Sequence, residues 1–186
     1  MKQLLKISGS TLGIFVVIFF ALFHFLFIEI NYDKNIKNDQ RIKNLDKKVF
    51  WSFGFEKISK SDRTSTDFTF DGKQKDTVNF TFYAIQSNKY RNVGQFKIHS
   101  STGFNGQNIF IYRLKNRFRT EIEEFSDNDV ENEKKKRYKI ISQHLILDKE
   151  HYNKNDSVFG KLEIQFEDVF NNTTISSISY FQTKMQ

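Results

Sequence analysis

The strongest constraint on this chain is a stretch of 20 residues, 9–28, that contains no Asp, Glu, Lys or Arg. At about 1.5 Å per residue, a helix of this length crosses a hydrocarbon core about 30 Å thick. Only a helix can span alone, because each backbone N–H and C=O must be satisfied within the segment. A cleaved signal peptide has an apolar core of about 7–15 residues and ends at a small-x-small site. The sequence therefore predicts an uncleaved, single-pass transmembrane helix.

This helix divides the chain into four predicted parts. We expect a short basic tail at 1–8, the transmembrane helix at 9–30, a charged juxtamembrane linker at 31–48 and one β-rich domain at 49–186. The last part is long enough for one hydrophobic core. We predict that the protein lies in the cell membrane, in contact with the lipid bilayer.

The linker carries six basic and three acidic side chains. Its apolar residues are too sparse to form a buried stripe, which predicts a solvated spacer rather than a packed element: Ile36, Ile42 and Leu45. Counted alone, the basic residues after the helix favour a cytoplasmic C-terminal part. A short basic tail before one apolar helix is typical of a signal anchor, however. We therefore predict a cytoplasmic N-terminus and a domain outside the cell.

Three residues of the predicted helix are candidates for helix packing. Gly9 and Gly13 have the GxxxG spacing that lets a second helix approach closely. His24 is a polar residue inside the apolar run, where such side chains often have a partner. The alternatives are an unremarkable helix end for the glycines and a neutral imidazole near the interface for the histidine.

After residue 49, apolar and polar residues alternate with the period of two that is typical of strands with one wet face. Phe96 and Ile98 alternate with polar neighbours, as do Leu162, Ile164 and Phe166. Short Asn-, Asp- and Gly-rich turn signals separate these runs, so successive strands are expected to pair. The sequence predicts an all-β, antiparallel meander of about eight strands, folded as a barrel or a sandwich.

The segment 108–125 fits two structures. Its apolar residues have helical spacing, which would give an α+β fold with one amphipathic helix. It also has alternating strand faces. If the chain turns near Val130, the acidic residues at 121–124 come opposite the basic cluster at 134–137. Opposite charges across antiparallel strands are stabilising. We favour a long hairpin between 108–125 and 138–147.

The composition excludes several kinds of chemistry. The chain has no Cys, so it has no disulfide, thiolate nucleophile or Cys-ligated metal. His99 is followed by two serines, but no nucleophile-elbow motif surrounds them. His144, Asp148 and His151 would share a face only in a helix, and we expect strand and loop there. The sequence therefore predicts no catalytic residue, no cofactor and no metal site.

The net charge of +7 raises the question of nucleic acid. In a single strand over 110–119, the aromatic and basic side chains would occupy opposite faces, which argues against base stacking between cations. We predict no nucleic-acid partner. The charged face would instead bind another protein, and its candidate residues are Arg113, Lys115, Arg117 and Arg119.

One N-terminal span followed by a small β domain is similar in architecture to bitopic envelope proteins such as the lipopolysaccharide-export bridge protein of Gram-negative bacteria. That likeness concerns architecture alone. We expect a non-enzymatic binding or scaffold component of a cell-envelope assembly, with a membrane or envelope protein as partner. Two alternatives are a tethered carrier of a lipid or other apolar ligand and a hydrolase that uses His99 or His144.

Overall fold

The computed structural model describes most of the β domain and part of the N-terminal region. The described residues are 26–45, 65–70, 73–74, 80–86, 93–101, 105–126 and 137–186, together with positions 14, 16–18, 21 and 23.

The domain consists of two β-sheets. Sheet A has the strand order β1-β8-β7-β6-β5 and contains β1 (Ile28–Glu29), β5 (Phe80–Gln86), β6 (Val93–Ser101), β7 (Asn105–Leu114) and β8 (Arg117–Ser126). Sheet B has the order β2-β9-β10-β11-β3-β4 and contains β2 (Asn31–Tyr32), β3 (Ser65–Phe70), β4 (Lys73–Gln74), β9 (Tyr138–Leu147), β10 (Ser157–Asp168) and β11 (Thr173–Lys184). The all-β prediction is confirmed, and eight of these strands have six residues or more.

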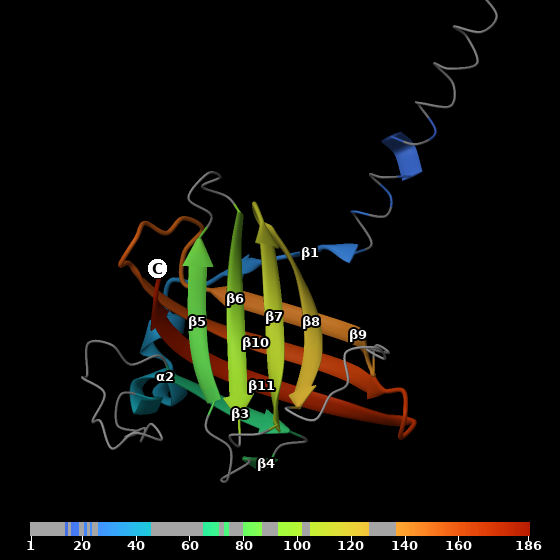
Figure 1. Ribbon diagram of the computed structural model, residues 1–186. Coiled ribbons are helices and arrows are strands. Elements are labelled where there is room, and N and C mark those ends of the chain that lie inside the picture. Colours follow the sequence, from blue (N-terminus) through green and yellow to red (C-terminus); the bar gives the residue numbers. More distant parts are fainter. Residues whose placement is uncertain are drawn as a thin grey trace, which may run out of the picture.

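The two sheets pack face to face as a sandwich, and the strands of one cross those of the other (Figure 1). Over the described residues they do not close into a barrel. Strands β5 to β8 form one antiparallel meander and β9 to β11 another, while β3 pairs with β11. The core lies between the sheets, where Phe96, Phe118, Leu162 and Phe181 are at most 1% exposed.

The alternation of apolar and polar residues predicts the buried faces of β6 and β10 correctly. On β10, Leu162, Ile164 and Phe166 are buried and the residues between them are only partly buried. Phe96 and Ile98 are buried in the same way on β6. The rule works because successive side chains of a strand point to opposite faces.

The segment 108–125 is neither a helix nor one arm of a hairpin with 138–147. It lies in a tight hairpin of its own, with β7 and β8 joined at Lys115 and Asn116. Strand β9 pairs with β10 along its length and with β2 at its end, in the other sheet. Both predictions for this segment are wrong because they missed the turn, which carries no Gly.

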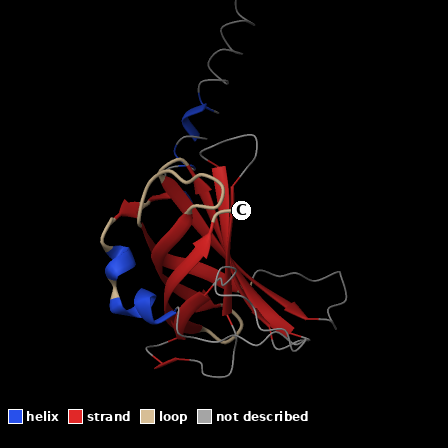
Figure 2. Cartoon of the chain, turned by 90° about the vertical axis from the view of Figure 1, so that its left-hand side faces the viewer, coloured by secondary structure: helices blue, strands red, loops and turns tan. Residues whose placement is uncertain are grey.

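The charged segment predicted as a solvated spacer is partly packed against the domain. The 3-10 helix η1 (Ile36–Asn38) and the helix α2 (Gln40–Leu45) lie on the outer side of sheet B (Figure 2). Ile36, Ile42 and Leu45 are 6%, 1% and 1% exposed and pack with Tyr180. These three apolar residues are enough to hold the segment on the sheet because both helices are short. Ile36 is the buried residue of η1, and Ile42 and Leu45 are the buried residues of the six-residue helix α2.

The N-terminal region meets the domain without a spacer. The backbone N–H of Phe27 donates to the carbonyl of Phe23 over 3.0 Å, and β1 begins at the next residue. Ile30 is 5% exposed in the core. The predicted helix boundary at residue 30 is therefore too late, because 28–30 belong to the β domain. Within the described residues, no helix has both the length and the apolar character needed to cross a bilayer.

Candidate functional site

The outward surface of sheet A is the candidate functional site, and we call it the open face. Strand register places its residues in rows across β6, β7 and β8, and the face comprises Gln95, Lys97, His99, Asn108, Phe110, Tyr112, Arg119, Glu121, Glu123 and Phe125. No helix or strand of the described chain lies over this surface (Figure 1). The opposite surface of the same strands is buried in the core.

Aromatic rings pack against one another on the open face. The rings of Phe110 and Tyr112 are stacked with centroids 6.0 Å apart, and those of His99 and Phe125 with centroids 5.5 Å apart. The ammonium of Lys97 lies 5.3 Å from the Phe110 centroid, within the range of a cation–π contact. These side chains remain partly exposed, so the face presents apolar surface to solvent in an ordered arrangement.

Polar groups orient the charged residues beside those rings. Arg119 forms an ion pair with Glu121, with side chains 32% and 27% exposed. Partial burial, together with the carboxylates of Glu121 and Glu123, raises the pKa of the Tyr112 hydroxyl, which donates to Glu121. Nδ1 of His99 donates to Oδ1 of Asn108 over 2.8 Å. The surface therefore combines exposed aromatic groups with polar groups held in position.

The structure does not bring the four basic candidates together on one surface. Arg113 is 6% exposed and points to the inner side of sheet A. Its guanidinium donates to the carbonyls of Lys115 and Glu150 and lies 5.9 Å from the Tyr152 ring centroid. Arg113 therefore joins the β7–β8 turn to the β9–β10 loop, and its expected place on an exposed face is wrong.

The other three basic candidates have different surroundings. Lys115 is exposed at the β7–β8 turn. Nη1 of Arg117 donates to the carbonyl of Phe27 over 2.8 Å, and its Nη2 lies 3.7 Å from Glu29. Arg117 and Arg119 point to the same outward surface of β8, but Arg117 is bound at its turn end, so of the four only Arg119 lies among the open-face residues named above. The partner-binding role stays a prediction. The surface that it concerns is now the open face, with the residues named above, instead of the four basic candidates.

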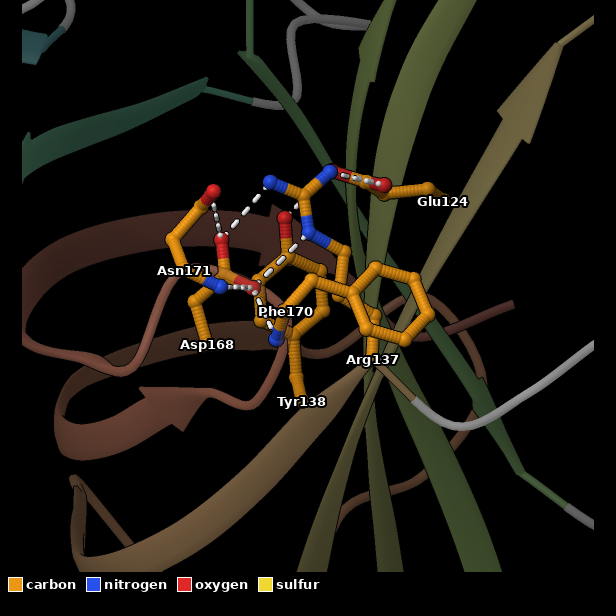
Figure 3. A network of polar contacts seen from close by, with 6 residues as sticks. All are labelled: Glu124, Arg137, Tyr138, Asp168, Phe170 and Asn171. Atoms are coloured by element: carbon orange, nitrogen blue, oxygen red, sulfur yellow. Dashed lines mark hydrogen bonds and ion pairs between the residues drawn. The ribbon is translucent and has the colours of Figure 1, made fainter.

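A second polar cluster lies where β9 begins and β10 ends (Figure 3). Nε and Nη2 of Arg137 donate to the two carboxylate oxygens of Asp168 over 3.0 and 2.6 Å. Nη1 of Arg137 donates to Glu124 over 2.8 Å, and the hydroxyl of Tyr138 also donates to Glu124. Of the basic cluster at 134–137, the structure describes Arg137, whose ion pair with Glu124 realises the expected attraction to residues 121–124. The pair lies between the two sheets rather than within one hairpin.

Asp168 in this cluster is fully satisfied as an anion. Its carboxylate, with a side chain 4% exposed, also accepts from Nδ2 of Asn171 over 2.7 Å and from two backbone N–H groups of the β10–β11 turn. The Arg137 guanidinium is the main reason that the pKa of Asp168 lies far below its usual range. Because its acceptors are used by the protein itself, this cluster holds the turn and the sheet edges rather than a ligand.

The histidine candidates are separated in the structure. His144 on β9 has Asn31 Nδ2 2.7 Å from its Nε2 and Glu163 3.3 Å from its Nδ1. Asp148 accepts from the Tyr152 hydroxyl over 2.6 Å, and His151 is exposed beside Glu150. Over the described part of the chain, no three His, Asp or Glu side chains form a group suited to a metal ion. Gly9, Gly13 and His24 lie outside the described residues.

Sequence reasoning missed that Phe110 and Tyr112 share a face with Arg119. In a continuous strand, residues 110, 112 and 119 would not all point the same way. The two-residue turn at Lys115 and Asn116 changes the parity, so Tyr112 stands directly opposite Arg119. A useful signal was present, because Asn is a common turn residue that lies here between two alternating runs.

Comparison of this chain with family models, with curated proteins and with solved structures found no match. Its own residues therefore carry the argument about function.

Proposed function

We propose that this chain is a single-pass membrane protein whose β-sandwich is a non-enzymatic binding module of a cell-envelope assembly. The open face carries the proposal, because ordered aromatic side chains are left partly exposed between charged residues. Aromatic residues and Arg dominate the binding energy of protein interfaces. The partner is a protein with a matching flat surface.

The anchor is the uncharged stretch at 9–28. The chain enters β1 directly after this stretch, and Arg117 donates to the carbonyl of Phe27. A basic side chain at the end of a helix also interacts favourably with the helix dipole. A module attached in this way sits close to the membrane, with the N-terminus in the cytoplasm and the domain outside.

Membrane attachment and sidedness are tested together in cells that express the full chain with a C-terminal tag. We expect the protein to resist extraction by alkaline carbonate, and the tag to be digested by protease in cells with an intact cytoplasmic membrane. Release by carbonate would rule out the anchor. A tag that is protected until the cytoplasmic membrane is permeabilised would reverse the orientation.

The binding surface is tested with a photoreactive phenylalanine derivative at position 110, compared with the same residue at Lys139 on the outer side of sheet B. Irradiation of membranes should give a defined crosslinked product from position 110 and none from position 139. Crosslinked products at neither position, or equally at both, would remove the open face as a binding surface.

The two alternative functions gain no observation of their own. Phe181 packs directly over Gly160 and fills this part of the core, which does not favour a carrier of apolar ligands. His99 and His144 are hydrogen-bonded to the amide side chains of Asn108 and Asn31, which does not favour the serine-bound imidazole of a hydrolase.

A further inference from the structure

We infer that the partner of the open face is a second copy of this chain, joined about a two-fold axis that runs along β7. The inference rests on the proposed binding role of this face and identifies its occupant. The geometry that points to it is the order of charges across the three strands β6, β7 and β8.

Three neighbouring rows of side chains cross the open face. A further row at the turn end, Val93, Leu114 and Arg117, lies beside them, and there Arg117 is bound to Phe27 and Glu29. Of the three neighbouring rows, the first is Gln95, Tyr112 and Arg119; the next is Lys97, Phe110 and Glu121; the third is His99, Asn108 and Glu123. In each row the β7 residue stands at the centre. The β8 residue is charged, and the β6 residue can bond to it through an amide, an ammonium or an imidazole.

A two-fold axis parallel to β7 keeps each row at its own level and exchanges its two ends. Lys97 of one copy then faces Glu121 of the other, and His99 faces Glu123. Gln95 faces Arg119 in the same way, while Phe110 and Tyr112 meet their own copies near the axis. Each pairing within these three rows is complementary and occurs twice, as a two-fold interface requires. The Glu121 carboxylate interacts with Arg119 and Tyr112 of its own chain, and a carboxylate, with about four lone-pair sites, can accept from a further donor.

The same axis is compatible with a shared membrane. Strands keep their direction under this rotation, so the β7–β8 turns of both copies lie at the same end of the dimer. The N–H of Ile30 donates to the carbonyl of Asn116 in that turn over 2.8 Å, so both N-terminal segments leave from this end. Two anchors can therefore enter one bilayer. A two-fold axis perpendicular to the strands would send them in opposite directions.

The size of the face sets the expected strength of the dimer. Three strands spaced about 4.8 Å apart and about nine residues long cover about 440 Å². A standard interface buries about 800 Å² per partner, so the isolated surfaces should associate weakly. Attachment to one membrane raises the effective concentration and favours pairing. The test must therefore use the full chain in a bilayer.

Because the chain has no Cys, single cysteines report contacts without background. Full-length variants Phe110→Cys, Tyr112→Cys and Lys139→Cys are placed in phosphatidylcholine liposomes at low protein density. They are then treated with a short thiol-to-thiol crosslinker. We expect a dimer from positions 110 and 112 and only monomer from position 139. Far-UV circular dichroism checks that each variant is folded. Two reporter positions are used so that the test still works if one substitution itself weakens the dimer.

Charge reversal identifies the pairing. In the Tyr112→Cys background, Lys97→Glu and Glu121→Lys should each lower dimer formation about tenfold, because each change places like charges together twice. Mixing the two variants, each with a different tag, should restore a crosslinked heterodimer. Lys139→Glu, on the other sheet, should change nothing.

The inference is overturned if positions 110 and 112 give no crosslinked dimer, or if position 139 gives as much crosslinked dimer as they do. It is also overturned if the mixture of Lys97→Glu and Glu121→Lys gives no more crosslinked dimer than either variant alone. A photocrosslink from position 110 to a different protein, without self-crosslinking, would overturn the dimer and leave the proposed binding function standing. The absence of both products would remove both.

Discussion

Individual residues of this protein are used mainly to hold elements together. Arg113 and Arg137 each donate to more than one segment, and Asp168 accepts from a guanidinium, an amide and the backbone. Removing a charge from water is costly unless its polar atoms find partners. Arg137 and Asp168 form an ion pair, and Arg113 donates to two backbone carbonyls. The positions of these residues could not be predicted from residue type alone, because their partners are distant in sequence.

Asp168→Asn should remove an acid-sensitive contribution to stability. The pKa of Asp168 is lowered in the folded protein, so its contribution is fully present above the unfolded-state pKa of about 3.9. It is lost as the pH falls from about 4 toward the lower folded-state value. We expect the variant to be less stable than the wild type at pH 7, and the gap to narrow between pH 5 and pH 2 on the usual linkage argument. Urea unfolding at these pH values measures it, and a constant gap would contradict the assignment.

Gly160→Ala should be destabilising because the position has no room for a methyl group. A Cβ there would overlap the ring of Phe181 and lie 2.7 Å from the carbonyl oxygen of Ile146. Overpacking of this kind costs about 1–3 kcal/mol of unfolding free energy. The expected loss is measured by urea unfolding. Phe181→Leu should lower the free energy of unfolding less in the Gly160→Ala background than in the wild type, because the smaller side chain relieves the overlap. Equal losses in the two backgrounds would refute the clash.

At the scale of secondary-structure elements, the local sequence pattern is sufficient to predict some strands but not the turns and short helices. The alternation in 157–168 predicts β10 and its buried face, since the side-chain period of a strand is a local property. The β7–β8 turn and the packing of α2 depend on short, weak signals. A helix of six residues has little intrinsic stability, so contact with sheet B decides whether it forms.

Lys115→Gly should stabilise the β7–β8 hairpin. Lys115 has φ of 56°, a conformation that costs an L-residue about 1 kcal/mol or more relative to Gly. We expect a gain of about 1 kcal/mol in unfolding free energy on that basis. Lys115→Ala is the matched control, since it removes the same side chain and keeps the backbone cost. Equal stability of the two variants would show that backbone conformation is not the cause.

Ile42→Ala tests the attachment of α2. Ile42 is 1% exposed against Tyr180 and the outer side of sheet B. Removing its buried side chain should cost about 2–3 kcal/mol, measured by thermal unfolding. Amide exchange within α2 should become faster at the same time. Lys43→Ala on the same helix is the control, and its effect should be close to zero. A similar small effect at Ile42 would mean that α2 is not held by this contact.

At the scale of the whole molecule, the N-terminal segment and the β domain form a continuous structure. Residues 28–32 pair first with β8 in sheet A and then with β9 in sheet B. The chain therefore crosses from one sheet to the other immediately after the proposed anchor. This arrangement would give the proposed binding module a defined position relative to the proposed anchor, which a solvated linker would not provide.

A truncation experiment tests this continuity. A chain that begins at Phe27 keeps β1, β2, η1 and α2, and we expect it to unfold cooperatively. A chain that begins at Val49, the predicted domain boundary, lacks four buried side chains, which are Ile30, Ile36, Ile42 and Leu45. It should melt at a clearly lower temperature or fail to fold, as followed by circular dichroism. Equal melting temperatures would show that residues 27–48 are dispensable.

The sequence by itself determined the strand character of the domain, the inward faces of β6 and β10 and the uncharged N-terminal stretch. These follow from the spacing of apolar residues along a short length of chain, which needs no knowledge of distant partners. Tertiary structure decided which strands are neighbours, that Arg113 is buried, that 36–45 packs on sheet B, and that Tyr112 and Arg119 share a face. Such features depend on contacts between residues far apart in sequence, and one unrecognised two-residue turn reverses the direction of every side chain that follows it.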